Sequence, residues 1–104
     1  MVEKYYNENN ELGVLVSGGF GAGWSTWNDK ELAYDKRIVE KFLENVSSDE
    51  MCNFVESLGY ARPYMGGYED IELEFVPRGT AFRIHEYDGL ESIETLEDMD
   101  MIVA

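Results

Sequence analysis

Cys52 and His85 are the residues of this sequence with the side chains for nucleophilic or acid–base catalysis, and each is the sole member of its type. A cysteine–histidine pair, or a histidine acting as general base, needs a further group that orients the imidazole, and the sequence specifies none. His85 alternates with Arg83 and Tyr87, so we expect all three on one solvent-facing side of a strand. We therefore expect no catalytic residues and a protein that is not an enzyme.

Oxygen ligands for a hard cation are concentrated near the C-terminus, at Glu94, Glu97, Asp98 and Asp100. A calcium loop places its acids in an Asp-x-Asp-x-Asp-Gly pattern followed by a terminal glutamate, and this sequence lacks that pattern. A single cysteine also excludes an intrachain disulfide and a cysteine-cluster zinc site. We expect neither a dedicated metal site nor a cofactor.

Residues 17–28 contain four glycines and two tryptophans, directly after an apolar segment. The run lacks the Gly-Lys-Ser/Thr ending of a P-loop, and a dinucleotide-binding pattern through Gly19 and Gly21 would need glycine where the chain has Trp24. Phosphate binding by this backbone is therefore disfavoured.

Two interpretations of the aromatic residues in this run stay open. In one, they combine with a second glycine-containing loop at residues 60–68 to form a pocket for a nucleobase or another flat ligand, with an arginine for a phosphate. The residues of that pocket would be Phe20, Trp24, Trp27, Arg62, Tyr64 and Tyr68. In the other, the glycines permit turns and the tryptophans cover the core.

Acidic residues outnumber basic ones by 22 to 8, which gives a formal net charge of −14. Such a field repels phosphate backbones and anionic membranes, so we expect a basic protein as partner rather than nucleic acid or a membrane surface. The competing interpretation is that the acidity serves solubility alone. The expected partner-binding residues lie in the second part of the chain: Glu69, Asp70, Glu72, Glu74, Glu86, Asp88, Glu91 and Glu94.

Helical periodicity predicts two helices in the middle of the chain. Ile38, Val39 and Phe42 recur on one stripe of an amphipathic helix expected over residues 29–46. Ser47 and Glu50 form a capping box that starts a second helix, which is expected to end at Gly59.

Alternating and apolar runs predict the strands. They are expected at residues 2–6, 12–17, 71–76, 81–87 and 90–96, with a further one at 99–104. Residues 13–16 are nearly all apolar, which suits a strand covered on both faces. We expect the first two strands to form one hairpin and the next two another, with Asp88-Gly89 as a tight turn to the fifth. The predicted fold is α+β, in the order ββααβββ with or without a final strand: an antiparallel sheet with two helices packed on one face.

The whole chain, residues 1–104, has the length of a single domain. No apolar run approaches the ~20 residues that span a bilayer, and the first residues lack a signal-peptide layout. We expect a cytoplasmic protein.

Residues 23–28, 32–40 and 79–89 resemble segments of a family of small, uncharacterised bacteriophage and prophage accessory proteins. The similarity extends over residues 12–93 and leaves the acidic tail outside. That family has no assigned activity, so it supplies no site residues. The resemblance implies a setting in the cytoplasm of a bacterial host, where such proteins bind and block host or defence proteins.

The leading hypothesis is an anti-CRISPR-like inhibitor, whose acidic surface mimics phosphates and covers a basic nucleic-acid-binding surface of another protein. The alternative is a protein that sequesters a small ligand, such as a nucleotide signal, between the two glycine and aromatic loops. A homo-oligomeric phage component is a further alternative.

Overall fold

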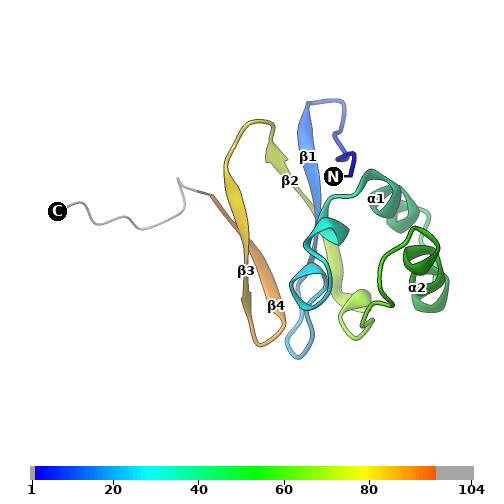
Figure 1. Ribbon diagram of the computed structural model, residues 1–104. Helices are drawn as coiled ribbons and strands as arrows, with labels where there is room; N and C mark the ends of the chain where they lie inside the picture. The colour runs from blue at the N-terminus through cyan, green and yellow to red at the C-terminus, as the bar shows by residue number, and fades with distance from the viewer. Residues whose placement is uncertain (1, 96–104) are drawn as a thin grey trace.

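The computed structural model describes residues 2–95 and has an α+β fold, as expected (Figure 1). Its strands and helices are β1 (Glu11–Ser17), α1 (Lys36–Leu43), α2 (Ser48–Ser57), β2 (Ile71–Pro77), β3 (Phe82–Tyr87) and β4 (Leu90–Thr95). Three short 3-10 turns, at Ser25–Trp27, Lys30–Ala33 and Tyr68–Asp70, connect them.

The strands form two antiparallel ladders rather than one continuous sheet. β1 pairs with β2, so that Glu11 faces Pro77 and Ser17 faces Ile71, and β3 pairs with β4. The β1–β2 ladder lies between the two helices and the β3–β4 ladder, which makes three layers (Figure 1). β1 is therefore covered on both faces, as its apolar sequence predicted.

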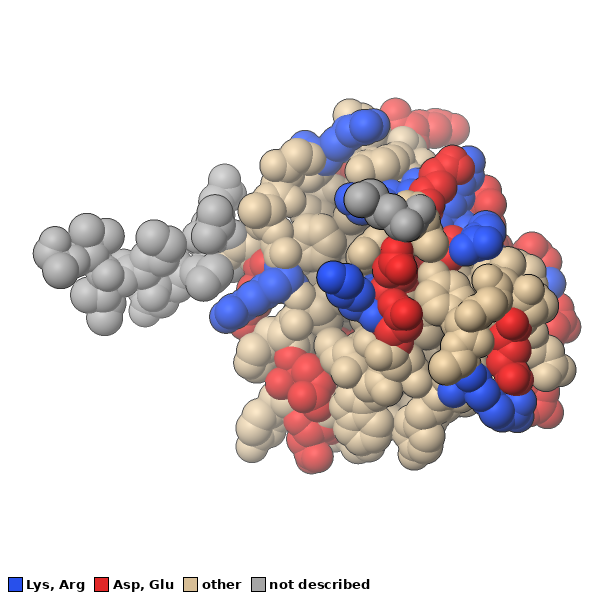
Figure 2. Space-filling view, in the orientation of Figure 1, with Lys and Arg blue, Asp and Glu red and all other residues tan. Residues whose placement is uncertain are grey.

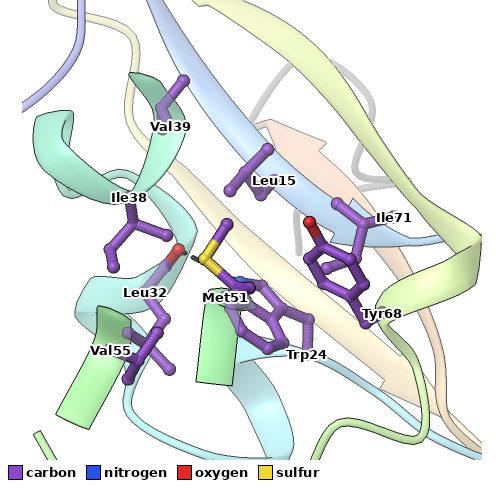
Figure 3. Packing of buried hydrophobic residues seen from close by; sticks show 9 residues of the cluster. All are labelled: Leu15, Trp24, Leu32, Ile38, Val39, Met51, Val55, Tyr68 and Ile71. Carbon is purple, nitrogen blue, oxygen red and sulfur yellow. Dashed lines mark hydrogen bonds between the residues drawn. The ribbon is translucent and has the colours of Figure 1, made fainter. Parts of the chain in front are cut away.

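Alternation along β1 divides the core in two. Leu15 points to the helices and joins the larger cluster in Figure 3, with Trp24, Leu32, Ile38, Val39, Met51, Val55, Tyr68 and Ile71. Leu12, Val14 and Val16 point to the other side, where Phe82, Ile84 and Ile93 of the second ladder pack against them. Each fully buried aliphatic side chain stabilises the fold by about 2 kcal/mol. Because β1 contributes buried side chains to both clusters, it holds the three layers together.

The first predicted helix is shorter than expected and starts later. Instead of one helix over residues 29–46, the chain makes the turn Lys30–Ala33, breaks at Tyr34, and begins α1 at Lys36. The break is caused by Asp35, whose carboxylate accepts a hydrogen bond from the backbone N–H of Arg37 (3.0 Å) and so caps α1. After α1, Asn45 adopts a positive φ of 57° and ends the segment.

The carboxylate of Asp35 is almost completely buried, and both of its oxygens accept hydrogen bonds. The Arg37 guanidinium binds both of its oxygens, at 3.1 and 2.8 Å, and the Tyr60 hydroxyl donates to it at 2.7 Å. Burial alone would raise the pKa of Asp35, but the donors Arg37 and Tyr60 outweigh burial and lower it. Burial and the neighbouring Asp35 carboxylate raise the pKa of Tyr60 strongly, so that its hydroxyl stays a donor.

The second helix is confirmed. Ser47 caps α2 by accepting a hydrogen bond from the backbone N–H of Glu50 (3.1 Å). Gly59 follows the helix with a positive φ of 99°, the conformation that a helix C-terminus favours in glycine.

Strand pairing corrects two of the expected hairpins. The hairpin between residues 71–76 and 81–87 is wrong, because β2 pairs with β1 and not with β3. The opening hairpin is reduced to the bridge between Tyr6 and Leu12. The β3–β4 hairpin is confirmed, with positive φ at both Asp88 and Gly89. The strand expected at residues 99–104 lies outside the described residues.

Candidate binding surface at the loop junction

Three loops meet at the end of the molecule where Ser17 pairs with Ile71: residues 18–28, residues 64–70 and the β3–β4 turn (Figure 1). Two glycines allow the approach. A Cβ on Gly67 would lie 2.7 Å from the carbonyl oxygen of Ala22, and a Cβ on Gly89 would lie 2.2 Å from the backbone nitrogen of Ala22. Only a residue without a side chain fits at either place. We call this region the loop junction.

A buried carboxylate holds the glycine-rich loop in place. Glu91 of β4 is 3% exposed. One of its oxygens accepts a hydrogen bond from the backbone N–H of Ser17 (2.8 Å). The other accepts from the backbone N–H groups of Trp24 (2.8 Å) and Thr26 (3.0 Å) and from the Thr26 hydroxyl (2.6 Å). The loop thus folds around a glutamate, not around a phosphate.

This position of Glu91 corrects the prediction that its carboxylate contacts a partner. The alternating sequence of β4 gives no indication that this acid is turned inward. The indication lies in the loop itself, since a glycine-rich segment has backbone N–H groups that must find acceptors when it is buried. Charge counting alone misses a glutamate that serves as such an acceptor.

Two of the aromatic residues predicted for a ligand pocket belong to the core instead. Trp24 is fully buried, and its indole N–H donates to the carbonyl of Leu32 (3.1 Å; Figure 3). Tyr68 is also buried, meets Trp24 edge-on with ring centroids 6.2 Å apart, and donates its hydroxyl hydrogen to the carbonyl of Val46. For these two residues, the interpretation that they cover the core applies.

The other three aromatic residues are on the surface. Phe20, Trp27 and Tyr64 are 67%, 43% and 56% exposed. The rings of Trp27 and Tyr64 lie against each other in a tilted arrangement, with an interplanar angle of 30° and centroids 5.7 Å apart. The Asn28 side chain fixes this pair by donating to the Tyr64 carbonyl (3.1 Å) and accepting from the Tyr64 backbone N–H (2.8 Å). An exposed apolar pair held in this way is pre-organised for contact.

Glu86 connects this aromatic pair to the β3–β4 turn. Its carboxylate accepts hydrogen bonds from the backbone N–H of Gly89 (2.8 Å) and from the indole N–H of Trp27 (3.1 Å). The Gly89 N–H and then the Trp27 indole lower the pKa of Glu86. Glu86 is therefore a fixed, ionised group directly beside Trp27.

The remaining predicted acids differ in their surroundings. Five of them are exposed and make no ion pair within residues 2–95: Glu69, Asp70, Glu72, Glu74 and Asp88. Asp70 packs against Gly19, and the carbonyl of Asp88 accepts from the Gly21 backbone N–H, so both lie at the loop junction. Glu94 is neutralised by Arg83 (2.9 Å) and lies 3.8 Å from His85.

Glu72 and Glu74 share one face of β2, but β3 does not pair with that strand. Arg83 and His85 therefore cannot offset their charge across a ladder and contact Glu94 instead. Arg83, His85 and Tyr87 are all exposed, as predicted. In Figure 2, acidic and uncharged side chains lie together at the lower left, over the β3–β4 turn.

We define the aromatic–acidic surface as the exposed residues of the loop junction together with the partly buried Glu86, which combine large apolar groups with carboxylates that make no ion pair among the described residues. Its members are Phe20, Trp27, Tyr64, Glu69, Asp70, Glu86, Tyr87 and Asp88. It includes four of the eight acids predicted for partner binding and three of the six residues predicted for a ligand pocket.

Arg62, the predicted phosphate partner, pairs with Glu56 at 2.6 Å. It lines a cavity of about 720 Å³ together with Trp27, Asn28 and Lys30. Phe20, Trp24, Tyr64 and Tyr68 do not line this cavity, so the predicted six-residue pocket is not assembled as one site.

Cys52 is buried in α2, away from the exposed His85 on β3. Within residues 2–95, no group of three or more His, Cys, Asp and Glu side chains could hold a metal ion. No helix in that range is long and apolar enough to cross a membrane. In comparisons with known proteins, no family model, no curated protein and no solved structure matches this chain.

Proposed function

We propose that this chain is a binding protein that uses its aromatic–acidic surface to cover a basic surface of another protein. The observation that carries the proposal is the Trp27–Tyr64 pair, whose rings are exposed and in contact and whose residues are hydrogen-bonded to Glu86 and Asn28. Aromatic residues that are exposed and rigid are the usual anchors of protein interfaces.

The chemistry of the partner follows from the groups around this pair. Glu69, Asp70 and Asp88 have no cation within ion-pair distance in the described part of the chain. An arginine of a partner can stack on Trp27 while its guanidinium binds Glu86 or Asp88, which combines a cation–π contact with an ion pair. A nucleic-acid-binding surface, rich in arginine and lysine, offers such groups.

The biological setting is the further part of the proposal. The resemblance to phage and prophage accessory proteins, together with the charge of −14, supports an inhibitor of a host or defence protein in the bacterial cytoplasm. In that role the carboxylates of the surface occupy the places of nucleic-acid phosphates.

The test uses the purified protein as bait in a bacterial lysate at ~0.1 M salt and again at ~0.5 M salt, where charges on the surface are screened. A basic protein captured by the wild type is then purified and its affinity measured by calorimetry. We expect Trp27→Ala/Tyr64→Ala to weaken that affinity by at least about tenfold. Phe75→Ala is the matched control, because Phe75 is as exposed as Trp27 but lies on β2 opposite Gly13.

Equal affinities of the two aromatic variants would contradict the proposal. So would affinity that does not fall with salt, since the carboxylates would then make no contribution.

The cavity beside Trp27 supports a second candidate function, the capture of a small flat anion. The cavity has a volume of about 720 Å³, and Trp27 offers it a ring and Lys30 a positive charge. Arg62, which pairs with Glu56, lines it as well. A nucleotide that binds there raises the melting temperature, because it stabilises the folded state by an amount that grows with the logarithm of one plus its concentration over its dissociation constant. Trp27→Ala and Arg62→Gln should both abolish that shift, and a shift that survives both would exclude this cavity.

A further inference from the structure

A groove lies at the opposite end of the β1–β2 ladder from the loop junction, where Glu11 pairs with Pro77. It consists of two adjoining depressions of about 420 and 470 Å³, which share Lys4, Tyr6 and Arg78. The buried side chains of Leu12 and Val76, with the partly buried Phe82, form its apolar wall. We call it the cationic groove.

The charges around this groove are opposite to those of the rest of the protein. Its lining contains Lys4, Lys36 and Arg78 but a single acid, Glu3, which pairs with Lys36 at 3.9 Å. In the whole chain, acids outnumber bases by 22 to 8. A local excess of positive charge is therefore not a by-product of composition.

Lys4 and Arg78 are also exceptional in their pairing. Five of the eight basic residues lie within 4.0 Å of a carboxylate: Lys36, Arg37, Lys41, Arg62 and Arg83. The other three, Lys4, Lys30 and Arg78, have no such neighbour within residues 2–95, and two of these three line the cationic groove.

Uncharged groups hold these two cations in place. The Arg78 guanidinium lies 4.5 Å from the centre of the Tyr6 ring and donates to the Asn10 side-chain carbonyl at 3.3 Å. The Lys4 ammonium lies 5.7 Å from the centre of the Tyr34 ring. Such contacts orient a cation without neutralising it, so both remain available to an anion.

We propose that the cationic groove binds a small organic anion: a carboxylate, phosphate or sulfonate group on an apolar or aromatic body. The anionic group binds Arg78 and Lys4, and the apolar body lies along Leu12, Val76 and Phe82. Each depression has the volume of a small-molecule site, and a mostly apolar wall with a few orienting polar groups is the usual composition of such sites.

The net charge of −14 does not oppose this site at physiological salt. Charges farther away than about 8 Å are largely screened at 0.15 M ionic strength, so the groups that line the groove decide its potential. The site is independent of the proposed function, since its residues lie at the other end of β1 from the aromatic–acidic surface.

The test titrates the full-length protein with 1-anilinonaphthalene-8-sulfonate, an aromatic sulfonate whose fluorescence reports binding. We expect saturable binding that causes chemical-shift changes at the backbone amides of Lys4, Tyr6 and Arg78. Phenyl phosphate should displace the probe, and the uncharged benzyl alcohol should not. Because Lys4→Gln/Arg78→Gln removes both cations that bind the sulfonate, it should weaken binding by at least about tenfold, which corresponds to about 1.4 kcal/mol.

The matched control is Lys41→Gln/Arg83→Gln, which also removes one lysine and one arginine, but at positions outside the cationic groove where both cations already pair with carboxylates. We expect it to leave the affinity for the probe unchanged, and circular dichroism checks that both variants are folded. Equal weakening in both variants, or displacement by benzyl alcohol as strong as by phenyl phosphate, would overturn the proposal. A dimer that Lys4→Gln/Arg78→Gln dissociates in size-exclusion chromatography would overturn it as well, because the groove would then be an interface between copies.

Discussion

The carboxylate of Glu91 lies 2.8 Å from the backbone nitrogen of Trp24, a residue 67 positions earlier in the chain. Through this contact, the carboxylate of a residue in β4 lies within the glycine-rich loop and holds the loop in its conformation. Trp24 can then turn its ring into the core while Trp27, three residues later, remains on the surface. One buried acid therefore helps to place Trp24 in the core and Trp27 on the surface.

Replacing Glu91 should be the most damaging single change to the loop junction. Glu91→Ala leaves the N–H groups of Ser17, Trp24 and Thr26 without their acceptor, so we expect the free energy of unfolding to fall by about 3 kcal/mol. Urea denaturation measures the loss. The control Glu74→Ala, at an exposed acid without an ion pair, should change stability by less than about 0.5 kcal/mol. Similar losses for both variants would contradict the role assigned to Glu91.

We expect the fluorescence of Trp27 to depend on pH, because the carboxylate of Glu86 accepts a hydrogen bond from its indole N–H. Because the pKa of Glu86 is lowered in the folded protein, its stabilising contacts are present above the unfolded pKa of about 4.3 and are lost as pH falls through the lower folded value. Trp27 fluorescence should therefore change with a midpoint below pH ~4.3. Glu86→Gln should remove this transition, while the buried Trp24 contributes a constant signal. A midpoint at or above the ordinary glutamate value would refute the prediction.

The buried Asp35 should stabilise the protein through its donors. Tyr60→Phe removes one donor to a buried carboxylate and should lower the free energy of unfolding by about 2 kcal/mol. Because the donors hold the pKa of Asp35 low, its contribution is complete above the unfolded value of about 3.9 and is lost as pH falls through the folded value. Urea denaturation at several pH values tests this, with the exposed Tyr64→Phe as a control near zero. Equal effects of the two substitutions would count against it.

Gly67 should tolerate no side chain. Its φ of −94° is accessible to any residue, so the cost of Gly67→Ala is steric and arises where a Cβ meets the carbonyls of Ala22 and Gly23. We expect a loss of about 1–3 kcal/mol in thermal or urea denaturation. Gly18→Ala is the control, because a Cβ there has its nearest neighbour at 3.6 Å. If Gly67→Ala is as stable as Gly18→Ala, the loops do not approach as closely as described.

Elements that are determined by neighbouring residues could be predicted from the sequence. The capping box at Ser47 gave the start of α2, the Asp88-Gly89 pair gave the β3–β4 turn, and the apolar run in β1 predicted its burial on both faces. In each case the decisive interaction joins residues close in sequence, or depends on one strand alone.

Strand pairing could not be predicted in this way. Alternation in residues 71–76 and 81–87 states which side chains share a face but not which strand lies beside them. The turn-like Pro77-Arg78-Gly79-Thr80 is compatible with a hairpin, but β2 pairs with β1, and its residue Ile71 joins the core cluster that packs against the helices. The break before α1 was missed for a related reason: Asp35 caps the helix with help from Tyr60, a residue 25 positions away.

The candidate surface was predicted in part. The sequence does not show which aromatic residues face the core, because the glycine-rich loop has no periodicity from which to infer this. Trp27 and Tyr64 are exposed, whereas Trp24 and Tyr68 are buried. Charge counting identified Asp70, Glu86 and Asp88 correctly as surface acids, because acids are rarely buried. The same rule failed for Glu91, the exception that the loop requires.

The hydrogen bond from Ser17 to Glu91 joins residues 74 positions apart, and this has a consequence for synthesis on the ribosome. A nascent chain that ends before β4 has β1, both helices and every exposed aromatic residue of the glycine-rich loop, but no acceptor for the N–H groups of that loop. Contacts so distant in sequence form late. We therefore expect the loop junction to take its folded conformation only after β4, the last described strand, has been translated.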